Sequence, residues 1–299
     1  MSRRADVSTV GILYCGDLGA AIARLLQRAG VRVVTTCEGR SRRTRERAQS
    51  AEVEILPTLD AVASVADVVV SLVLPGAATD VAREYVNRRS LCPRDSLFVD
   101  ANSIDVPTLA AMDSTLAAAG IRFVDAAIHG GAKSLAELGV MYVSGRDAQD
   151  VSQVFSEAIC VHSLGERVGQ ATRMKLLLGG LSKSLNALFL EIGILSHNAD
   201  LLDEFLGEAK RFYPGIMTAI DRMLPTYPQH AARRVVELQS IEGLARSVCA
   251  PCQMVASARE LLKAAAGAWH EEWQTTGEMD ISRMITIAAT ATTHTDTGQ

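Results

Sequence analysis

The chain has 299 residues, of which 48% are hydrophobic, 21% charged and 4% aromatic, and its formal net charge is −4. That length suits two domains better than one, and the apolar share can fill a sizeable core. The slightly acidic balance and the scarcity of aromatic side chains argue against nucleic-acid binding and against a basic membrane-surface protein. Composition therefore favours a helix-rich α/β enzyme that acts on a small molecule.

The first residues and the cysteines indicate the compartment. MSRRADVSTVGIL carries basic residues but no apolar segment ahead of the first expected strand, so we expect no signal peptide. No apolar run reaches the roughly 18 residues needed to span a bilayer. The pair Cys249-Ala-Pro-Cys252, in a stretch with a helical pattern, cannot complete a zinc site alone, so no metal is expected. A reduced, cytoplasmic protein is the simplest interpretation, with six scattered cysteines: Cys15, Cys37, Cys92, Cys160, Cys249 and Cys252.

Apolar runs alternate with helical patterns through the first half of the chain. Such alternation implies a mostly parallel sheet with helices on both faces, as in a Rossmann domain. The expected strands cover 8–13, 31–36, 66–74, 96–102, 121–127 and 140–145, and the expected helices cover 17–29, 42–51 and 105–119.

The pattern changes near residue 164. β-branched runs disappear there, and a helix expected from about 166 to 197 opens a half in which almost every segment has helical periodicity. We therefore expect an α/β domain over 1–164 and an all-α domain over 165–299.

The stretch VGILYCGDLGAAIARLL resembles a dinucleotide-binding turn between a strand and a helix. In G-x-G-x-x-G the first glycine makes the tight turn, the second admits the pyrophosphate and the third lets helix and strand pack closely. Gly16 and Gly19 occupy the second and third positions, whereas Tyr14 replaces the first and must avoid a positive φ. We expect the pyrophosphate on the helix N-terminus, near Leu18. Asp17 there either caps the helix or puts a negative charge beside the phosphate.

The segment TTCEGRSRRTRER, after the second strand, bears on the choice of cofactor. Glu38 lies where an acid takes the ribose 2′-OH of NAD. Arg40 and Ser41 suit the 2′-phosphate of NADP instead. The remaining arginines either assist or form a solvated helix start. We expect NADP, with NAD as the alternative, and further cofactor contacts from Leu74, Pro75 and Asn102.

Three later segments add a family resemblance. They are SLFVDANS at 96–103, IRFVDAAIHGG at 121–131 and GQATRMKLLLGGLSK at 169–183. In this order they resemble the β-hydroxyacid dehydrogenase and 6-phosphogluconate dehydrogenase superfamily. The segments EGRS and ARRVVELQSIEGLA look closest to a poorly characterised branch with a phosphogluconate-dehydrogenase-like C-terminal domain. The resemblance covers essentially the whole chain and implies an NAD(P)-dependent dehydrogenase or reductase that dimerises through its helical domain.

Carried over by position, the resemblance implies roles for individual residues. Lys175 matches the catalytic lysine, a general base in alcohol oxidation and a general acid in ketone reduction. Gly130 and Gly131 match paired glycines that let substrate lie against the backbone, and Ser103 lies near the substrate. His129 replaces a serine that contacts the substrate carboxylate; it either binds an anionic group, transfers a proton or is structural.

Two departures concern the substrate. Gly179 replaces an asparagine that holds substrate or cofactor in the family. Lys183, eight residues after Lys175, returns to nearly the same helix face and adds a second catalytic-site cation. We therefore expect a small, acidic hydroxy compound and its carbonyl form as the reacting pair. An imine reductase of a biosynthetic pathway and a non-catalytic nucleotide-binding dimer stay open as alternatives; Tyr14 and Gly179 motivate the latter.

Overall fold

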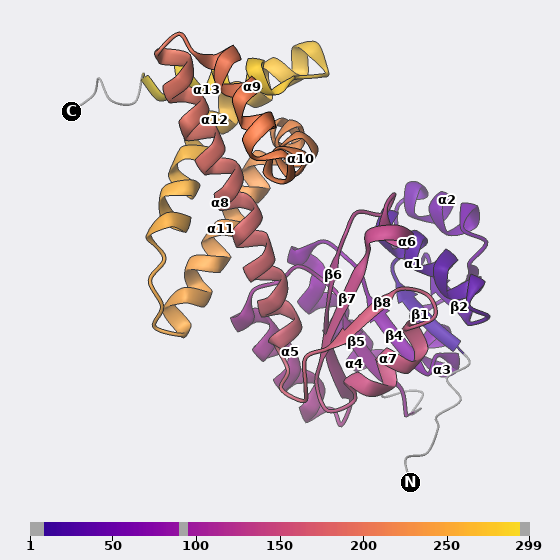
Figure 1. Cartoon of the computed structure of the whole chain (residues 1–299). Helices are drawn as coiled ribbons and strands as arrows, with labels where there is room; N and C mark the ends of the chain where they lie inside the picture. The colour runs from indigo at the N-terminus through magenta and orange to yellow at the C-terminus, as the bar shows by residue number, and fades with distance from the viewer. Residues whose placement is uncertain (1–8, 90–94, 294–299) are drawn as a thin grey trace. The chain divides into compact units, whose positions relative to one another are not determined.

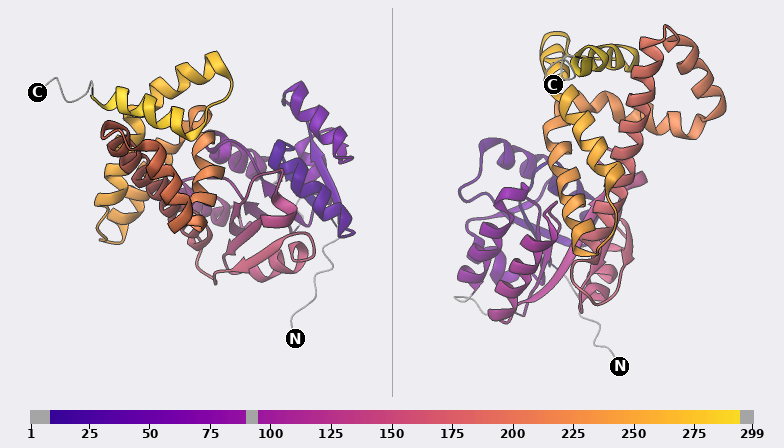
Figure 2. Two further views of the ribbon diagram at one scale, coloured as in Figure 1. Left: turned by 45° about the horizontal axis from the view of Figure 1, so that its top comes forward. Right: turned by 90° about the vertical axis from the view of Figure 1, so that its left-hand side faces the viewer.

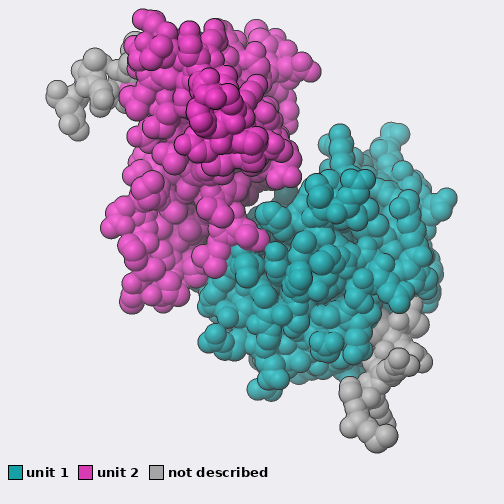
Figure 3. Space-filling view, viewed as in Figure 1, with its two compact units in different colours: residues 1–175 teal, residues 176–299 magenta. Residues whose placement is uncertain are grey.

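The structure is a computed structural model that describes residues 9–89 and 95–293. The chain forms two compact units, Met1–Lys175 and Leu176–Gln299, which Figure 3 colours separately. We call them the sheet unit and the helical unit and describe each by itself. Cys92, counted above among the scattered cysteines, lies outside the described residues.

The sheet unit contains one eight-stranded sheet in the order β3-β2-β1-β4-β5-β6-β7-β8 (Figure 1). Neighbouring strands pair in parallel except β6 and β7, which are antiparallel. The expected mostly parallel sheet is therefore confirmed. Its strand order reverses between β1 and β4, where doubly wound sheets bind their ligands. The strands are β1 Thr9–Leu13, β2 Arg32–Thr36, β3 Glu54–Leu56, β4 Val68–Ser71, β5 Leu97–Asp100, β6 Arg122–His129, β7 Val140–Ser144 and β8 Cys160–Ser163.

Helices cover both faces of this sheet, as the views in Figure 2 show. Two separate hydrophobic clusters fill the two faces. One face packs against α1 Asp17–Arg28, α2 Arg42–Ser50, α6 Leu135–Leu138 and α7 Ala148–Phe155. The other packs against α3 Leu59–Val65, α4 Ala78–Arg89 and α5 Val106–Ala118, with the short η1 Pro75–Ala77 ahead of α4.

The helical unit is built from long helices around one core. Trp269 lies at its centre, where its indole N–H donates to the carbonyl of Met284 over 2.9 Å. Its ring meets that of Tyr227 edge to face. The expected all-α second half is confirmed, with α8 Gln170–Asn198, α9 Leu202–Phe212, α10 Pro214–Met223, η2 Leu224–Thr226, α11 Tyr227–Ser247, α12 Gln253–Thr276 and α13 Ile281–Thr293.

Three expectations about this half need correction. Helix α8 begins at Gln170 instead of about 166, because Gly169 has a φ of +96° and cannot continue a helix upstream. The cysteine pair is in the connection between α11 and α12 instead of a helix, since Pro251 disfavours helix at the residue before it.

The third correction concerns apolar length. Helix α8 is long and apolar enough to cross a membrane by length and composition, although no such run was expected. Ala187, Phe189 and Leu190 of this helix belong to the buried core of the helical unit. We therefore interpret α8 as a core helix.

Candidate cofactor and proton-transfer site

The turn between β1 and α1 has room for a pyrophosphate. Gly16 is the N-cap of α1, and no side chain caps the helix there. A Cβ at Gly16 would meet no atom within 4 Å, so the approach to the helix N-terminus is open. A Cβ at Gly19 would lie only 2.4 Å from the Tyr14 carbonyl oxygen, so α1 packs on β1 only with glycine there. The unpaired N–H groups of such a helix start suit an anion, and these residues fit a dinucleotide.

Tyr14 closes the turn without the conformation that glycine would supply. Among the described residues, the non-glycine residues with a positive φ are Glu52, Asp200 and Cys249. Tyr14 does not have a positive φ, as expected. Its carbonyl accepts a hydrogen bond from the N–H of Gly16 over 2.8 Å. Its ring is buried in the α3–α4 face of the sheet. The position of the missing glycine is thus filled by a core residue.

Asp17 lies in the first turn of α1 and is paired across to α2. Arg47 Nη2 approaches its carboxylate to 2.6 Å. The pair offsets the negative charge that would otherwise oppose a phosphate at this helix start. Leu18 follows in the same turn and is half-buried against the core.

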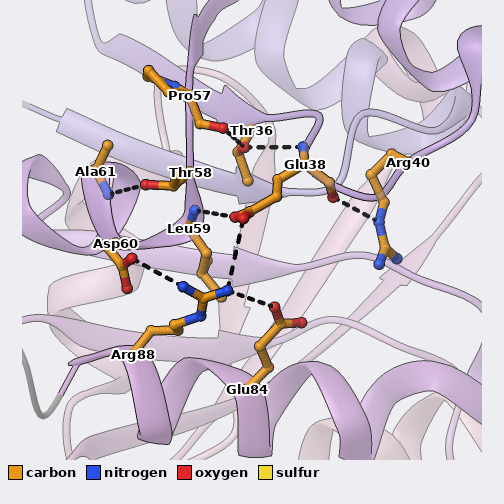
Figure 4. Close-up of polar contacts among 10 residues, drawn as sticks. All are labelled: Thr36, Glu38, Arg40, Pro57, Thr58, Leu59, Asp60, Ala61, Glu84 and Arg88. Atoms are coloured by element: carbon orange, nitrogen blue, oxygen red, sulfur yellow. Dashed lines mark hydrogen bonds and ion pairs between the residues drawn. The ribbon is translucent and has the colours of Figure 1, made fainter.

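Glu38 is engaged in a network on the α3–α4 face (Figure 4). Its Oε2 accepts from the N–H of Leu59 over 3.1 Å, at the start of α3. Its Oε1 lies 3.7 Å from Arg88 Nη2, while Arg88 Nη1 is 3.1 Å from Asp60. This carboxylate therefore serves the start of α3 and the arginine of α4.

Arg40 and Ser41 lie at the tip of β2, where the 2′ position of the cofactor is expected. The guanidinium of Arg40 stacks 4.5 Å above the ring of Tyr14, and its Nε donates to the Glu38 carbonyl over 3.3 Å. Ser41 is the N-cap of α2 and accepts from the N–H of Thr44 over 3.2 Å. Burial raises the pKa of Tyr14, and the charge of Arg40 opposes that shift. The exposed guanidinium is thus held beside a second helix N-terminus.

The three other expected cofactor residues follow β4 and β5. Leu74 and Pro75 are exposed at the start of η1. Asn102 is buried and joins the two strand ends: its Oδ1 accepts from Val73 N–H over 2.6 Å, and its Nδ2 donates to Ser71 Oγ over 2.9 Å. Its side chain is therefore committed to holding the backbone at this edge.

Lys175 and Ser103 meet directly. Lys175 Nζ donates to Ser103 Oγ over 2.7 Å, joining α8 to the loop after β5 within the sheet unit. Asp100, at the end of β5, is almost completely buried. Burial raises the pKa of Asp100 to about 7; its bonds from Asn102 lower it, Asp125 raises it and the charge of Lys175 lowers it. The amine of Lys175, the hydroxyl of Ser103 and a carboxyl group with a pKa near neutral, that of Asp100, therefore lie together at the end of β5.

The start of α8 is held on the sheet by two buried side chains that sequence reasoning missed. Asp125 accepts from the N–H of Thr172 over 3.0 Å and from its hydroxyl over 2.6 Å. Ser144 Oγ accepts from the N–H groups of Gln170 and Ala171 and donates to Asp125 over 2.9 Å. These bonds satisfy N–H groups that a helix start leaves unpaired, and they position Lys175 one turn further on.

The expected substrate segment follows β6. His129 is exposed at the end of that strand. Gly130 has a φ of +126°, and a Cβ there would lie 3.1 Å from Gly139 Cα. Gly131 is open apart from the hydroxyl of Ser134 at 4.0 Å. The glycine pair thus makes a tight turn whose second member is free of neighbours.

Lys183 and Gly179 belong to the helical unit, unlike Lys175. Lys183 Nζ donates to the Gly179 carbonyl over 3.2 Å and pairs with Glu237 at 2.9 Å. A Cβ at Gly179 would lie 3.0 Å from that Nζ. The ammonium therefore occupies space that a side chain at 179 would need.

The comparisons with known proteins identify the class. Residues 9–161 match the NAD binding domain of 6-phosphogluconate dehydrogenase, and residues 196–265 match a domain of unknown function, DUF1932. The chain belongs to the family defined by that NAD binding domain. The expected superfamily, a nicotinamide cofactor and an NAD(P)-dependent dehydrogenase or reductase are confirmed at this level.

Individual relatives agree with the family. An uncharacterized 28.5 kDa protein of Methanothermus fervidus is 27% identical over 242 residues, covering 78% of this chain and 89% of that protein. A conserved protein of unknown function, described as structurally similar to 3-hydroxyacid dehydrogenases, is 27% identical with a TM-score of 0.70, covering 85% of this chain and 96% of the other. The 3-hydroxyisobutyrate dehydrogenase of Mycobacterium tuberculosis, solved with L-serine, shares the fold at 17% identity and a TM-score of 0.71, covering 94% and 98%.

Proposed function

We propose that the protein interconverts a small, acidic hydroxy compound and its carbonyl form, with Lys175 as general acid and base and NADP as the preferred cofactor. The observation that carries the proposal is the 2.7 Å contact between Lys175 Nζ and Ser103 Oγ. It lies at the end of β5, beside buried Asp100 and in the same unit as the Gly16–Gly19 turn.

When bound, the nicotinamide would supply the acceptor or donor of hydride. In oxidation, Lys175 in its neutral amine form would take the hydroxyl proton of the substrate, so that loss of hydride from the same carbon leaves a carbonyl. In reduction, the ammonium returns that proton to the carbonyl oxygen. The Ser103 hydroxyl holds the Lys175 nitrogen in place by accepting a hydrogen bond from it.

Further residues are proposed to contact the substrate, and they come from each unit separately. His129 offers a ring N–H to an anionic group, and Gly130 and Gly131 let substrate approach the backbone. Gly179 makes room for the Lys183 ammonium, whose charge favours an acidic substrate.

The lysine is tested by Lys175→Met, which keeps the length of the side chain and removes its proton chemistry. We expect kcat to fall by about 10²- to 10⁴-fold on the best substrate in a panel of hydroxy acids, ketones and imines. The dissociation constant for NADPH stays unchanged. Lys263→Met, on an exposed position of α12, is the control. Full activity of Lys175→Met would contradict the proposal.

The preference for NADP rests on Arg40, Ser41 and the engagement of Glu38 with α3 and Arg88. We expect Arg40→Ala to weaken NADPH binding by about 10- to 100-fold, the range of one or two charge-assisted hydrogen bonds, and to leave NADH binding unchanged. Arg32→Ala, at the start of β2 and paired with Glu54, is the control. Equal affinities of the wild type for NADPH and NADH would overturn the preference. Binding of neither at millimolar concentration would overturn the enzyme proposal itself.

A homodimer through the helical unit is part of the proposal. Helix α8 exposes five large apolar side chains at helical spacing: Leu177, Leu181, Leu188, Ile192 and Leu195. A contiguous apolar stripe of this kind is typical of a surface that a second copy covers. Light scattering at micromolar concentration tests it, and a clean monomer would contradict it. The five described cysteines are unpaired, which supports the cytoplasmic location.

A further inference from the structure

The described part of the helical unit contains four buried side-chain atoms that make no hydrogen bond. They all belong to α8 and α11: Ser184 Oγ, Asn186 Oδ1, Tyr227 Oη and Arg234 Nε. Buried polar atoms in folded proteins almost always have partners. Their concentration on two facing helices therefore points to a missing partner at one place.

Two contacts set the register of these helices. Ile241 packs against Gly180, and one turn along Glu237 pairs with Lys183. Helices α8 and α11 are therefore antiparallel here. The same register brings Asn186 level with Arg234, one further turn along. Asn186 Oδ1 of α8 thus lies level with Arg234 of α11, whereas Ser184, two residues earlier, is on another side of α8.

The charges of this layer do not balance. Arg234 is 6% exposed and Lys183 is 9% exposed. Glu237 binds Lys183 at 2.9 Å and Arg233 at 3.3 Å. No described carboxylate lies within 4 Å of Arg234, which is held by the hydroxyl of Thr226 at 2.5 Å and by the ring of Tyr227 at 3.8 Å. A buried guanidinium without a counter-charge is costly.

Two titratable groups beside Arg234, His230 and Tyr227, add no charge to this layer. Burial, together with Arg233 and Arg234, lowers the pKa of His230, so this ring is neutral and adds no positive charge of its own. Burial raises the pKa of Tyr227, and Arg234 opposes that shift. The phenol thus stays protonated and can donate its hydrogen.

We propose that Arg234, Tyr227 and Lys183 form a binding site for an oxyanion, a carboxylate or phosphate group. The Arg234 Nε–H and the Tyr227 hydroxyl are the donors without an acceptor, and a guanidinium edge matches the two oxygens of such a group. Lys183 adds charge, while Asn186 Oδ1 offers an acceptor to a hydroxyl of the same ligand. These residues all lie within the helical unit, and the binding of an oxyanion there does not depend on the proposed function.

The tryptophans give a direct readout. The chain has two, Trp269 and Trp273, both on α12, and Trp269 lies edge-on to Tyr227 with ring centres 6.2 Å apart. Inorganic phosphate and acetate are titrated separately into the full-length protein without cofactor, at constant ionic strength. We expect a saturable change in tryptophan fluorescence and a rise in the unfolding temperature with at least one of them. Which probe binds more tightly distinguishes a phosphate site from a carboxylate site.

Variants assign the response to the site. Arg234→Met is expected to weaken anion binding at least tenfold, whereas Arg211→Met, an exposed arginine paired with Glu208, leaves it unchanged. Should Arg234→Met fail to fold, Tyr227→Phe keeps the ring beneath the guanidinium and removes only the hydroxyl; we expect it to weaken binding severalfold.

Three results would overturn the proposal. The first is no saturable change in fluorescence or unfolding temperature with either anion, and the second is an equal change in Arg234→Met and Arg211→Met. The third is a change that depends on the protein concentration and not on the concentration of added anion. The NADPH titration separates this outcome from the proposed function. Intact NADPH binding without an anion response rejects the oxyanion site alone.

Discussion

The two units differ in whether their buried polar groups have hydrogen-bond partners. At the strand ends of the sheet unit, Asp125 and Asn102 are bonded on several sides and hold backbone in place. In the helical unit, Arg234 and Tyr227 are as deeply buried and keep donor atoms without acceptors. The first arrangement stabilises the fold by itself. The second gains its full stabilisation only when a ligand binds.

The largest expected cost is at Asp125. Asp125→Ala leaves the hydroxyl and N–H of Thr172 without their acceptor and removes the partner of Ser144. We expect a loss of about 3–5 kcal/mol in the free energy of unfolding, because three buried hydrogen-bonding groups lose their acceptor at once. Urea unfolding measures it. Asp95→Ala, which removes an exposed partner of Arg122, should cost under about 1 kcal/mol. Equal costs would mean that Asp125 does not anchor α8.

Asp100 makes stability depend on pH. Its pKa is raised from 3.8 to about 7, so between these values the folded protein binds more protons than the unfolded chain. The contribution of this group to stability therefore falls as pH rises from about 4 to about 7, by up to about 1.4 kcal/mol per pH unit. Asp100→Asn removes that slope and gains relative to wild type as the pH rises to 8. Urea unfolding at pH 5, 6, 7 and 8 measures it, and parallel curves would contradict it.

The stack of Arg40 on Tyr14 provides a test of the proposed cofactor preference in the sheet unit. Its ring supports the Arg40 guanidinium, an interaction of about 0.5–1 kcal/mol. Tyr14→Ala should therefore reduce the preference for NADPH over NADH by about two- to fivefold. Tyr14→Phe keeps the ring and should keep the preference. Fluorescence titration with both cofactors measures the ratio. An unchanged ratio in Tyr14→Ala would show that the stack does not position Arg40.

Two matched serines test the contrast directly, and one of them, Ser184, has the smallest expected effect of all. Ser184 Oγ has no partner in the helical unit, so Ser184→Ala should change stability by less than about 0.5 kcal/mol. Ser144 Oγ accepts from two N–H groups of α8, and Ser144→Ala should cost about 1–3 kcal/mol. Equal costs for the two serines would remove the contrast between the units.

Sequence patterns predicted most of the fold. The six long apolar runs became β1, β2, β4, β5, β6 and β7, since strands buried on both faces are continuously apolar. Neither β3 nor β8 was predicted, because these two edge strands are partly exposed and carry no buried apolar run. The helices α3, α4, α6 and α7 were also outside the prediction. The two shortest of these, α3 and α6, span seven and four residues.

The site was less accessible to sequence reasoning. The turn glycines and Lys175 are visible because motifs mark them. Arg47 pairs with Asp17, and Asp125 accepts hydrogen bonds from Thr172, 47 residues further along the chain. Local spacing in the sequence predicts neither pair. A signal for two of the missed residues did exist: Asp100 and Asp125 are acids inside apolar strands, where charged side chains seldom lie without a structural or chemical purpose.

The anchoring of α8 on Asp125 and Ser144 has a consequence for how this protein can change. The lysine, its serine and the cofactor turn all lie within Met1–Lys175, and the bonds that set their geometry are made inside that unit. The residues of the proposed proton transfer can therefore be inherited together as one module. The helices beyond residue 175 can then change one side chain at a time without disturbing these bonds.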